Sequence, residues 1–177
     1  MPVPKSIHDD AKKIKLLVCD VDGVLTSGEI YLDNQEGELK AFNVKDGLGI
    51  NLLMKNDIKV AIITGRNSPV VTRRMNELGI EHYYQGQRDK QAAFDDLLEK
   101  TALEKQQVAY VGDDLPDIPL MKQCGLSFAP NDSYRFVLEQ VDWVLSANGG
   151  KGAVREISDI LLASQDKLEN IYRGYNS

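Results

Sequence analysis

Two carboxylates follow directly after an apolar segment near the start of the chain. Residues 14–19 are rich in branched apolar side chains, a composition typical of a central strand in a parallel sheet. Asp20 and Asp22 come next, with Gly23 behind them. Such a run also opens ordinary turns. Open α/β sheets, however, place their ligand sites at the carboxyl ends of such strands, and two carboxylates this close stay ionised only beside a cation. The spacing favours a site for a divalent metal ion.

Three further segments carry chemically useful side chains in a similar setting. Each either ends an apolar, strand-like run or stands directly before a helical pattern, where a side chain can reach the same edge of the sheet. The segments are Ile62-Ile63-Thr64-Gly65-Arg66, Gly86-Gln87-Arg88-Asp89-Lys90, and Ala109-Tyr110-Val111-Gly112-Asp113-Asp114 with Asp117 in the following turn.

In this order and spacing the segments resemble the four motifs of the haloacid dehalogenase superfamily of phosphohydrolases. The blocks D-V-D-G-V-L-T-S-G, F-N-V-K-D-G-L-G, I-T-G-R-N-S, G-D-D-L-P-D and G-G-K-G-A-V-R-E resemble one capless branch, the 3-deoxy-D-manno-octulosonate 8-phosphate phosphatases. The resemblance extends over roughly residues 14–163. It implies Mg²⁺-dependent hydrolysis of that sugar-acid phosphate through an aspartyl-phosphate, a step in the synthesis of lipopolysaccharide precursors.

The resemblance also implies roles for the carboxylates. Asp20 would be the nucleophile and would bind metal through its side chain. Asp22 would serve as general acid and base and would bind metal through its main-chain oxygen. Asp113 would be the third protein ligand, and an all-oxygen set of this kind suits Mg²⁺. Asp114 could hold a metal-bound water or orient its neighbours. For Asp117, a metal bond, a capping role and a bond to Lys90 all remain open.

Three of the predicted site residues would bind the phosphoryl group or neutralise its charge, and a fourth would bind the sugar acid. The Thr64 hydroxyl and the Gly65 N–H can donate hydrogen bonds to a phosphoryl oxygen. Lys90 would neutralise Asp20 and the transferred group as a point charge. Arg66 could pair with a sugar-acid carboxylate through its planar fork.

Two more residues are predicted to bind the substrate. Lys45 and Asp46 flank the expected cleft, on the block that the resemblance assigns to the phosphatase branch. Together with Gly65 and Arg66 they complete the predicted substrate-binding set. The assignment of Lys45 and Asp46 depends on the resemblance more than on their local chemistry.

The bulk composition is that of a globular protein. The 177 residues are 42% apolar and 27% charged, with a net charge of -6. This charge argues against nucleic acid as the main partner, and no apolar run is long enough to span a membrane. Cys19 and Cys124 have no metal-binding or disulfide-like spacing. The first residues lack the apolar core of a signal peptide, so we expect a cytoplasmic protein.

Strand-like and helix-like patterns alternate after residue 14, which predicts an α/β fold. We expect one Rossmann-like, three-layer domain over residues 1–177, with a parallel sheet and a polar tail at about 164–177. A β-hairpin at about 28–42 would stand in place of a cap domain, and the resemblance implies a homotetramer in which neighbouring hairpins cover each other's clefts. The predicted strands are 14–19, 58–63, 81–84, 107–111, 126–129 and 142–145; the predicted helices are 46–56, 68–79, 89–101, 115–123, 133–139 and 151–163.

Two other functions remain open from the sequence. A phosphatase for another sugar-acid phosphate, such as a nine-carbon ulosonate 9-phosphate, would share every catalytic residue and differ only in the cleft lining. A non-catalytic oligomerisation module would be expected to lose motif residues, yet the predicted nucleophile, acid/base, hydroxyl, lysine and third metal ligand are all present.

Overall fold

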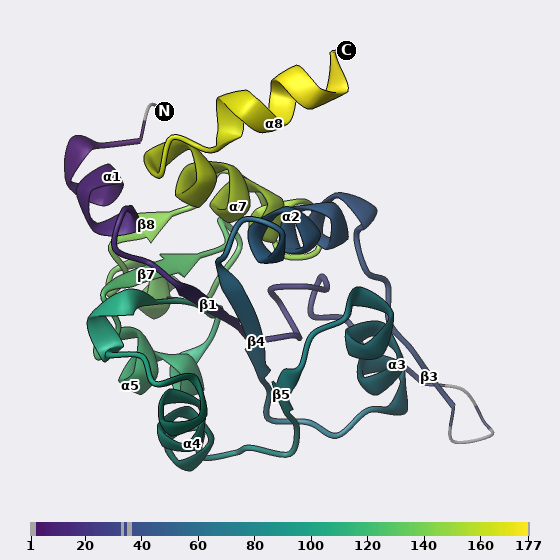
Figure 1. Cartoon of the computed structure of the whole chain (residues 1–177). Helices are drawn as coiled ribbons and strands as arrows, with labels where there is room; N and C mark the ends of the chain where they lie inside the picture. Colours follow the sequence, from purple (N-terminus) through teal and green to yellow (C-terminus); the bar gives the residue numbers. More distant parts are fainter. Residues whose placement is uncertain (1–2, 33, 35–36, 177) are drawn as a thin grey trace.

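The apolar segments form a six-stranded parallel sheet, as predicted (Figure 1). The computed structural model describes residues 3–32, 34 and 37–176. The strand order is β5-β4-β1-β6-β7-β8, with the strand that precedes Asp20 in the middle. The strands are β1 (Leu16–Cys19), β4 (Lys59–Ile63), β5 (His82–Tyr84), β6 (Val108–Val111), β7 (Leu126–Ala129) and β8 (Trp143–Val144).

Strand β1 is fully buried because both of its edges and both of its faces are covered. It pairs in parallel with β4 and with β6, so that Cys19 lies between Ile62 and Val111. Its side chains alternate between the two faces of the sheet. Leu17 and Cys19 belong to one apolar cluster, and Leu16 and Val18 belong to the other. An apolar run without polar alternation is what such a position requires.

Helices cover both faces of the sheet and give the predicted three layers. On one face lie α1 (Lys5–Ala11), α2 (Val44–Met54), α3 (Pro69–Leu78) and α7 (Ala153–Ser164), which share the apolar cluster of Cys19. On the other face lie α4 (Gln91–Thr101), α5 (Ile118–Met121) and α6 (Arg135–Leu138). Short 3₁₀ turns stand at η1 (Lys105–Gln107) and η2 (Leu115–Asp117).

Two predicted helices are shorter in the structure. The segment predicted as helix 115–123 divides into η2 and α5, with Pro116 and Pro119 near the start of each. Proline lacks the N–H that a helix interior needs, so it is tolerated only in a first turn. The segment predicted as helix 133–139 is helical only in α6.

Local signals in the sequence define helix α3, which follows the segment containing Thr64. The Ser68 hydroxyl accepts a hydrogen bond from the Val71 N–H at 3.4 Å, and Pro69 occupies the first turn. Gly79 ends the helix with a φ of 73°, a conformation that glycine adopts without strain. These caps hold the loop between β4 and α3 in place above the sheet.

The predicted hairpin is present after β1 but is short. Strands β2 (Tyr31–Leu32) and β3 (Glu38–Leu39) pair antiparallel, and the hairpin projects beside α3 (Figure 1). Residues 33, 35 and 36 of the predicted turn lie outside the described residues. Leu32 and Leu39 are 74% and 70% exposed, so this chain alone does not cover them.

The chain ends in a helix that was not predicted. Helix α8 (Leu168–Tyr175) packs on the rest of the molecule through Leu168 and Ile171 and buries no residue fully (Figure 1). Among the described residues, none of the helices is long and apolar enough to cross a bilayer.

Candidate active site

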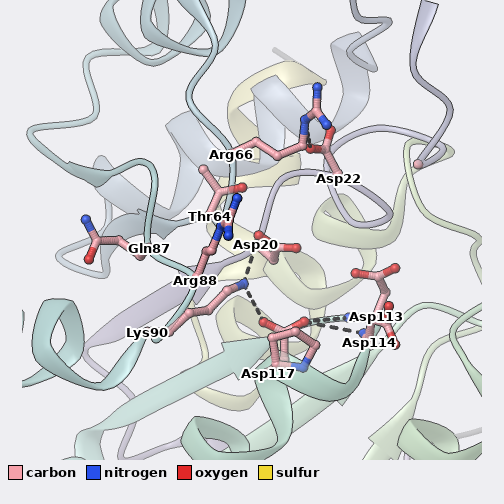
Figure 2. A pocket seen from close by; sticks show the side chains of 13 residues that line it. Asp20, Asp22, Thr64, Arg66, Gln87, Arg88, Lys90, Asp113, Asp114 and Asp117 are labelled. Atoms are coloured by element: carbon pink, nitrogen blue, oxygen red, sulfur yellow. Dashed lines mark hydrogen bonds and ion pairs between the residues drawn. The ribbon is translucent and has the colours of Figure 1, made fainter.

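The predicted chemical side chains meet in one cleft at the carboxyl ends of β1, β4 and β6. Figure 2 shows Asp20, Thr64 and Lys90 converging there from different elements. The cleft has a volume of about 470 Å³. Its lining consists of Asp20, Asp22, Gly28, Thr64, Gly65, Arg66, Gln87, Arg88, Lys90, Asp113, Asp114, Pro116 and Asp117.

Asp20 and Lys90 form a buried ion pair at the base of the cleft. Lys90 Nζ lies 3.0 Å from Asp20 Oδ1 and 2.7 Å from Asp117 Oδ1. Lys90 is only 4% exposed. Burial alone would lower its pKa, but the two carboxylates raise the pKa above the usual range, so the ammonium stays charged. The Asp89 carboxylate accepts the Gln91 N–H at 3.0 Å and fixes the backbone on either side of Lys90.

Asp117 positions other site residues and has no free oxygen. Its Oδ1 accepts hydrogen bonds from Lys90 at 2.7 Å and from the Tyr110 hydroxyl at 2.9 Å. Its Oδ2 accepts the N–H groups of Asp113 and Asp114 at 3.2 and 3.4 Å. Four donors occupy its lone pairs. Of the roles that the sequence leaves open for Asp117, this geometry favours capping and the bond to Lys90 over a metal bond.

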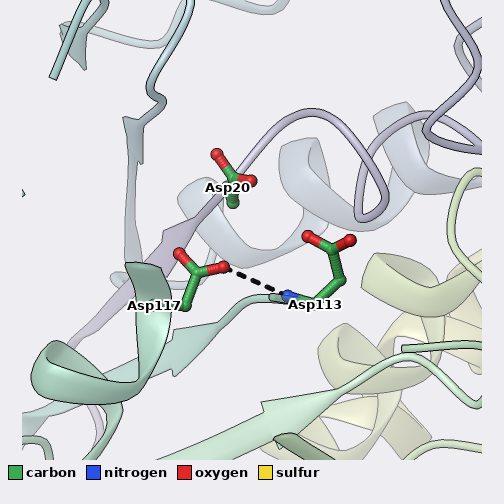
Figure 3. Close-up of side chains that lie close together, drawn as sticks. All are labelled: Asp20, Asp113 and Asp117. Carbon is green, nitrogen blue, oxygen red and sulfur yellow. Dashed lines mark hydrogen bonds between the residues drawn. The ribbon is translucent and has the colours of Figure 1, made fainter. Parts of the chain in front are cut away.

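Three carboxylates gather tightly enough to hold a cation. Oxygens of Asp20, Asp113 and Asp117 all lie within 4.8 Å of one another (Figure 3). Burial, together with the negative charge of Asp20, raises the pKa of Asp113 to about 8. Burial also raises the pKa of Asp20 to about 6 despite the opposing effect of Lys90. Asp20 Oδ1 is buried, and Lys90 Nζ lies 3.0 Å from it. Two neighbouring carboxylates whose pKa values are raised by burial and by each other's charge fit a divalent cation held by Asp20 and Asp113, because a cation stabilises both ionised groups.

Asp22 lies at the cleft rim and bonds to two cations. The Lys40 ammonium donates a hydrogen bond to Asp22 Oδ1, and Arg66 Nε lies 3.8 Å from Asp22 Oδ2. Glu38 closes this group through ion pairs with Lys40 at 3.4 Å and with Arg66 at 3.3 Å. The Ser68 hydroxyl also donates to Glu38. Because Lys40 and Glu38 belong to the hairpin, these contacts connect the base of the hairpin to Asp22 and to Ser68 at the start of α3.

A glycine behind the two carboxylates lets the loop turn toward the third one. Gly23 has a φ of 87°, and a Cβ there would lie 2.1 Å from Asp113 Oδ2. The loop is packed from behind by Gly149, where a Cβ would lie 1.9 Å from the Gly23 carbonyl oxygen. The Gly150 N–H donates to the Val24 carbonyl at 2.9 Å. The Gly149–Gly152 segment therefore supports the Asp20 loop and does not line the cleft.

Thr64 is fixed by backbone bonds on both sides. Its N–H donates to the Tyr84 carbonyl at 2.9 Å, and its carbonyl accepts the Gln87 N–H at 3.0 Å. The side chain is 2% exposed and lines the cleft together with Gly65. A hydroxyl and a main-chain N–H placed this way can donate to an anion that lies over Asp20.

Lys45 and Asp46 do not join the cleft. Asp46 is 1% exposed, and its carboxylate accepts the N–H groups of Arg155 at 2.8 Å and Gly152 at 3.3 Å. It thus satisfies the free donors at the start of α7. Lys45 lines a different cavity, beside Lys151. The structure therefore does not bring Lys45 and Asp46, part of the predicted substrate-binding set, to the carboxylates of the cleft.

Four residues at the site went unpredicted. Glu38 and Lys40 are two apart in the hairpin, so alternation along a strand places both on one face, and this signal was available in the sequence. Arg88 stands within the quoted Lys90 segment, but nothing in its spacing marks it. Tyr110 faces Asp117 only because β6 and η2 fold against each other, which no local pattern shows.

Comparisons with known proteins agree with this geometry. Residues 43–125 match the family model described as haloacid dehalogenase-like hydrolase. The chain is 51% identical over 168 residues to the 3-deoxy-D-manno-octulosonate 8-phosphate phosphatase KdsC of Yersinia pestis, covering 95% of this chain and 90% of the relative. The crystal structure of the Yersinia pestis phosphatase superposes with a TM-score of 0.94, covering 95% of this chain and 91% of that one.

A second solved structure was obtained with ligands. The phosphatase of the same name from Moraxella catarrhalis, in complex with magnesium ion, phosphate ion and KDO, is 39% identical. It superposes with a TM-score of 0.95 over 98% of this chain and 99% of that one. With identity well above 30% over almost the full length, the chain belongs to the 3-deoxy-D-manno-octulosonate 8-phosphate phosphatase family of haloacid dehalogenase-like hydrolases.

Proposed function

We propose that this protein is a Mg²⁺-dependent phosphatase that hydrolyses 3-deoxy-D-manno-octulosonate 8-phosphate. The observation that carries the proposal is the buried arrangement of Asp20, Lys90 and Asp113 at one cleft, in a chain 51% identical to phosphatases of that name. The magnesium and phosphate ions in the Moraxella catarrhalis enzyme support the choice of cofactor and reaction. A cytoplasmic location remains a prediction.

In this proposal the cleft residues divide the reaction into two steps. Asp20 attacks the phosphorus and forms an aspartyl-phosphate, while Asp22 protonates the leaving sugar oxygen. Asp22 then removes a proton from the water that releases phosphate. Thr64 and the Gly65 N–H donate to the phosphoryl oxygens, and Lys90 neutralises the nucleophile and the transferred group.

The metal would be held at the cluster of carboxylates. Asp20 and Asp113 would bind it through their side chains and Asp22 through its main-chain oxygen, with Asp117 holding Lys90 and the Asp113 backbone in place. Mg²⁺ in this position supplies positive charge to the phosphoryl oxygens. Because its oxygen ligands also suit other divalent ions, the metal preference needs a direct measurement.

We expect Mg²⁺ to stabilise the protein more at pH 8 than at pH 6. In the folded, metal-free protein the pKa of Asp20 is about 6 and the pKa of Asp113 is about 8. In the unfolded chain the pKa of an aspartate is roughly 4. The folded state therefore holds extra protons, and its stability falls as pH rises from about 4 to about 8. Mg²⁺ binds the ionised carboxylates, which are more abundant at pH 8, and so offsets this loss of folding stability.

Thermal unfolding with and without Mg²⁺ at the two pH values measures this effect. Asp113→Asn is the control, because it removes one of the two side-chain carboxylate ligands and should lose most of the gain in Tm at pH 8. An equal gain in Tm at both pH values would contradict the assignment of Asp20 and Asp113 as ligands.

Substrate identity is tested by kcat/KM over a panel of phosphate esters. The panel contains the octulosonate 8-phosphate, a nine-carbon ulosonate 9-phosphate and simple hexose phosphates. We expect the octulosonate to be preferred by at least about tenfold, a difference of only about 1.4 kcal/mol in transition-state binding. A preference for the nine-carbon acid would leave the phosphatase activity supported and would contradict the proposed substrate.

We further propose that the protein assembles as a homotetramer in which hairpins cover neighbouring clefts. The exposed apolar side chains of Tyr31, Leu32 and Leu39 on the hairpin support this, because one chain leaves them in water. The cleft is also open to solvent on the side of Asp22, which is 20% exposed. Sedimentation equilibrium gives the mass directly, and a monomer at micromolar concentration would rule the assembly out.

A further inference from the structure

One cationic side chain in the cleft has no anionic partner among the described residues. Arg66 pairs with Glu38 and Asp22, and Lys90 pairs with Asp20 and Asp117. Arg88 also lines the cleft and is exposed, but its guanidinium forms no ion pair or hydrogen bond with the residues described. Figure 2 shows it extending from the Lys90 loop into the cleft. A guanidinium held beside a substrate cleft without a partner is available to bind an anion.

The backbone beneath Arg88 is fixed next to the proposed phosphoryl site. The Gly86 N–H donates to the Arg66 carbonyl at 3.2 Å, and the Gln87 N–H donates to the Thr64 carbonyl at 3.0 Å. Two residues further on, Lys90 is held by its ion pairs. The Cα of Arg88 therefore lies on a short, anchored loop between the residues that supply a hydroxyl and an ammonium to the phosphoryl group.

The cleft has more negatively charged than positively charged side chains, so an anionic substrate needs additional positive charge there. Five carboxylates line the cleft, and only three cationic side chains accompany them, two of which already have carboxylate partners. A phosphate monoester brings further negative charge into a protein whose net charge is already -6. Among the described cleft residues, Arg88 is the cationic side chain whose charge no carboxylate already balances, so it can add positive charge to that of Lys90 and a bound divalent cation.

We propose that Arg88 is a substrate-binding residue whose guanidinium contacts the phosphate group of the substrate. The proposal rests on the phosphatase function proposed above. Its loop position between Thr64 and Lys90 favours the phosphate over the carboxylate at the far end of a sugar acid. Arg66, tied to Asp22 and Glu38 on the other side of Thr64, is better placed for that carboxylate.

The test compares Arg88→Gln with the wild type on two substrates. One is the octulosonate 8-phosphate, and the other is p-nitrophenyl phosphate, which has a phosphate but no carboxylate. Losing a charge-assisted contact to phosphate should lower kcat/KM for both by about 10- to 100-fold. Arg88→Lys keeps the charge without the planar fork and should recover part of the loss. Inorganic phosphate should inhibit Arg88→Gln more weakly by a similar factor.

Arg73→Gln is the matched control. Arg73 is exposed on α3 and does not line the cleft, so this variant loses the same charge and should keep wild-type kinetics. A loss in Arg88→Gln confined to the octulosonate would assign Arg88 to the carboxylate and overturn the proposal, as would unchanged kinetics on both substrates.

The two proposals can fail separately. If wild-type protein cleaves p-nitrophenyl phosphate but not the octulosonate, the substrate is wrong and Arg88 is still tested on the simple ester. If neither ester is cleaved, calorimetric binding of inorganic phosphate with Mg²⁺ present still compares wild type with Arg88→Gln. Equal affinity for phosphate in that measurement would overturn the role of Arg88.

Discussion

Replacing Asp20 with asparagine is expected to abolish phosphate release while preserving the fold. The amide has almost the same shape as the carboxylate but is a far weaker nucleophile toward phosphorus, so no aspartyl-phosphate forms. Removing a nucleophile costs about four to six orders of magnitude in kcat. Burial already disfavours the charge of Asp20, and Lys90 keeps Asp117 as a partner at 2.7 Å. The protein should therefore remain stable.

Steady-state phosphate release and circular dichroism melting together measure both parts of this prediction. Asp9→Asn makes the same chemical change on the exposed side of α1 and should behave as wild type. Activity of Asp20→Asn above about a thousandth of the wild-type rate would refute its role as nucleophile.

Replacing Lys90 with methionine should reduce both stability and activity severely. The side chain is 4% exposed and is the cation within 3.0 Å of both Asp20 and Asp117. Methionine fills much of the same volume but leaves two buried carboxylates facing each other. Breaking a buried ion pair by removing one partner costs about 3–5 kcal/mol. Loss of a charge aimed at the transferred group should lower kcat by a further factor of about 10²–10³.

The pH dependence of this loss distinguishes electrostatics from packing. Without Lys90, the pKa of Asp20 is no longer lowered by the ammonium, so protonation at pH 5 relieves part of the repulsion. Urea unfolding should therefore show a smaller loss at pH 5 than at pH 8. Lys100→Met is the matched control, because Lys100 pairs with Asp96 at 2.7 Å on the exposed side of α4 and should change stability little. A loss independent of pH would indicate packing alone.

The sheet could be predicted from the sequence because each strand is a short, continuous apolar run. Parallel strands buried on both faces have this signature, and all six were located. Helix α3 was predictable for a second reason, since Ser68, Pro69 and Gly79 mark its ends with local chemistry. Helix α8 has no capping side chain, but its apolar and aromatic residues recur at helical spacing, so a signal was present in the sequence and was missed: Leu168, Ile171, Tyr172 and Tyr175.

The local sequence placed a residue in the cleft most directly where that residue stands at the end of a predicted strand. Asp20, Thr64 and Asp113 each follow a strand, so parallel order alone brings them together. Lys40 reaches Asp22 from 18 positions away through the hairpin, and nothing local fixes that distance. Asp46 was expected in the cleft because it lies near the cleft-forming segments in the sequence. In the structure its carboxylate instead caps the start of α7, a contact that the local sequence does not show.

The most direct test of the proposed function is phosphate release from 3-deoxy-D-manno-octulosonate 8-phosphate by protein freed of metal with a chelator. Wild type and Asp20→Asn are assayed side by side, each with and without added Mg²⁺. The proposal predicts release only from wild type with Mg²⁺. Release by Asp20→Asn, or an equal rate from wild type without any divalent metal, would contradict it.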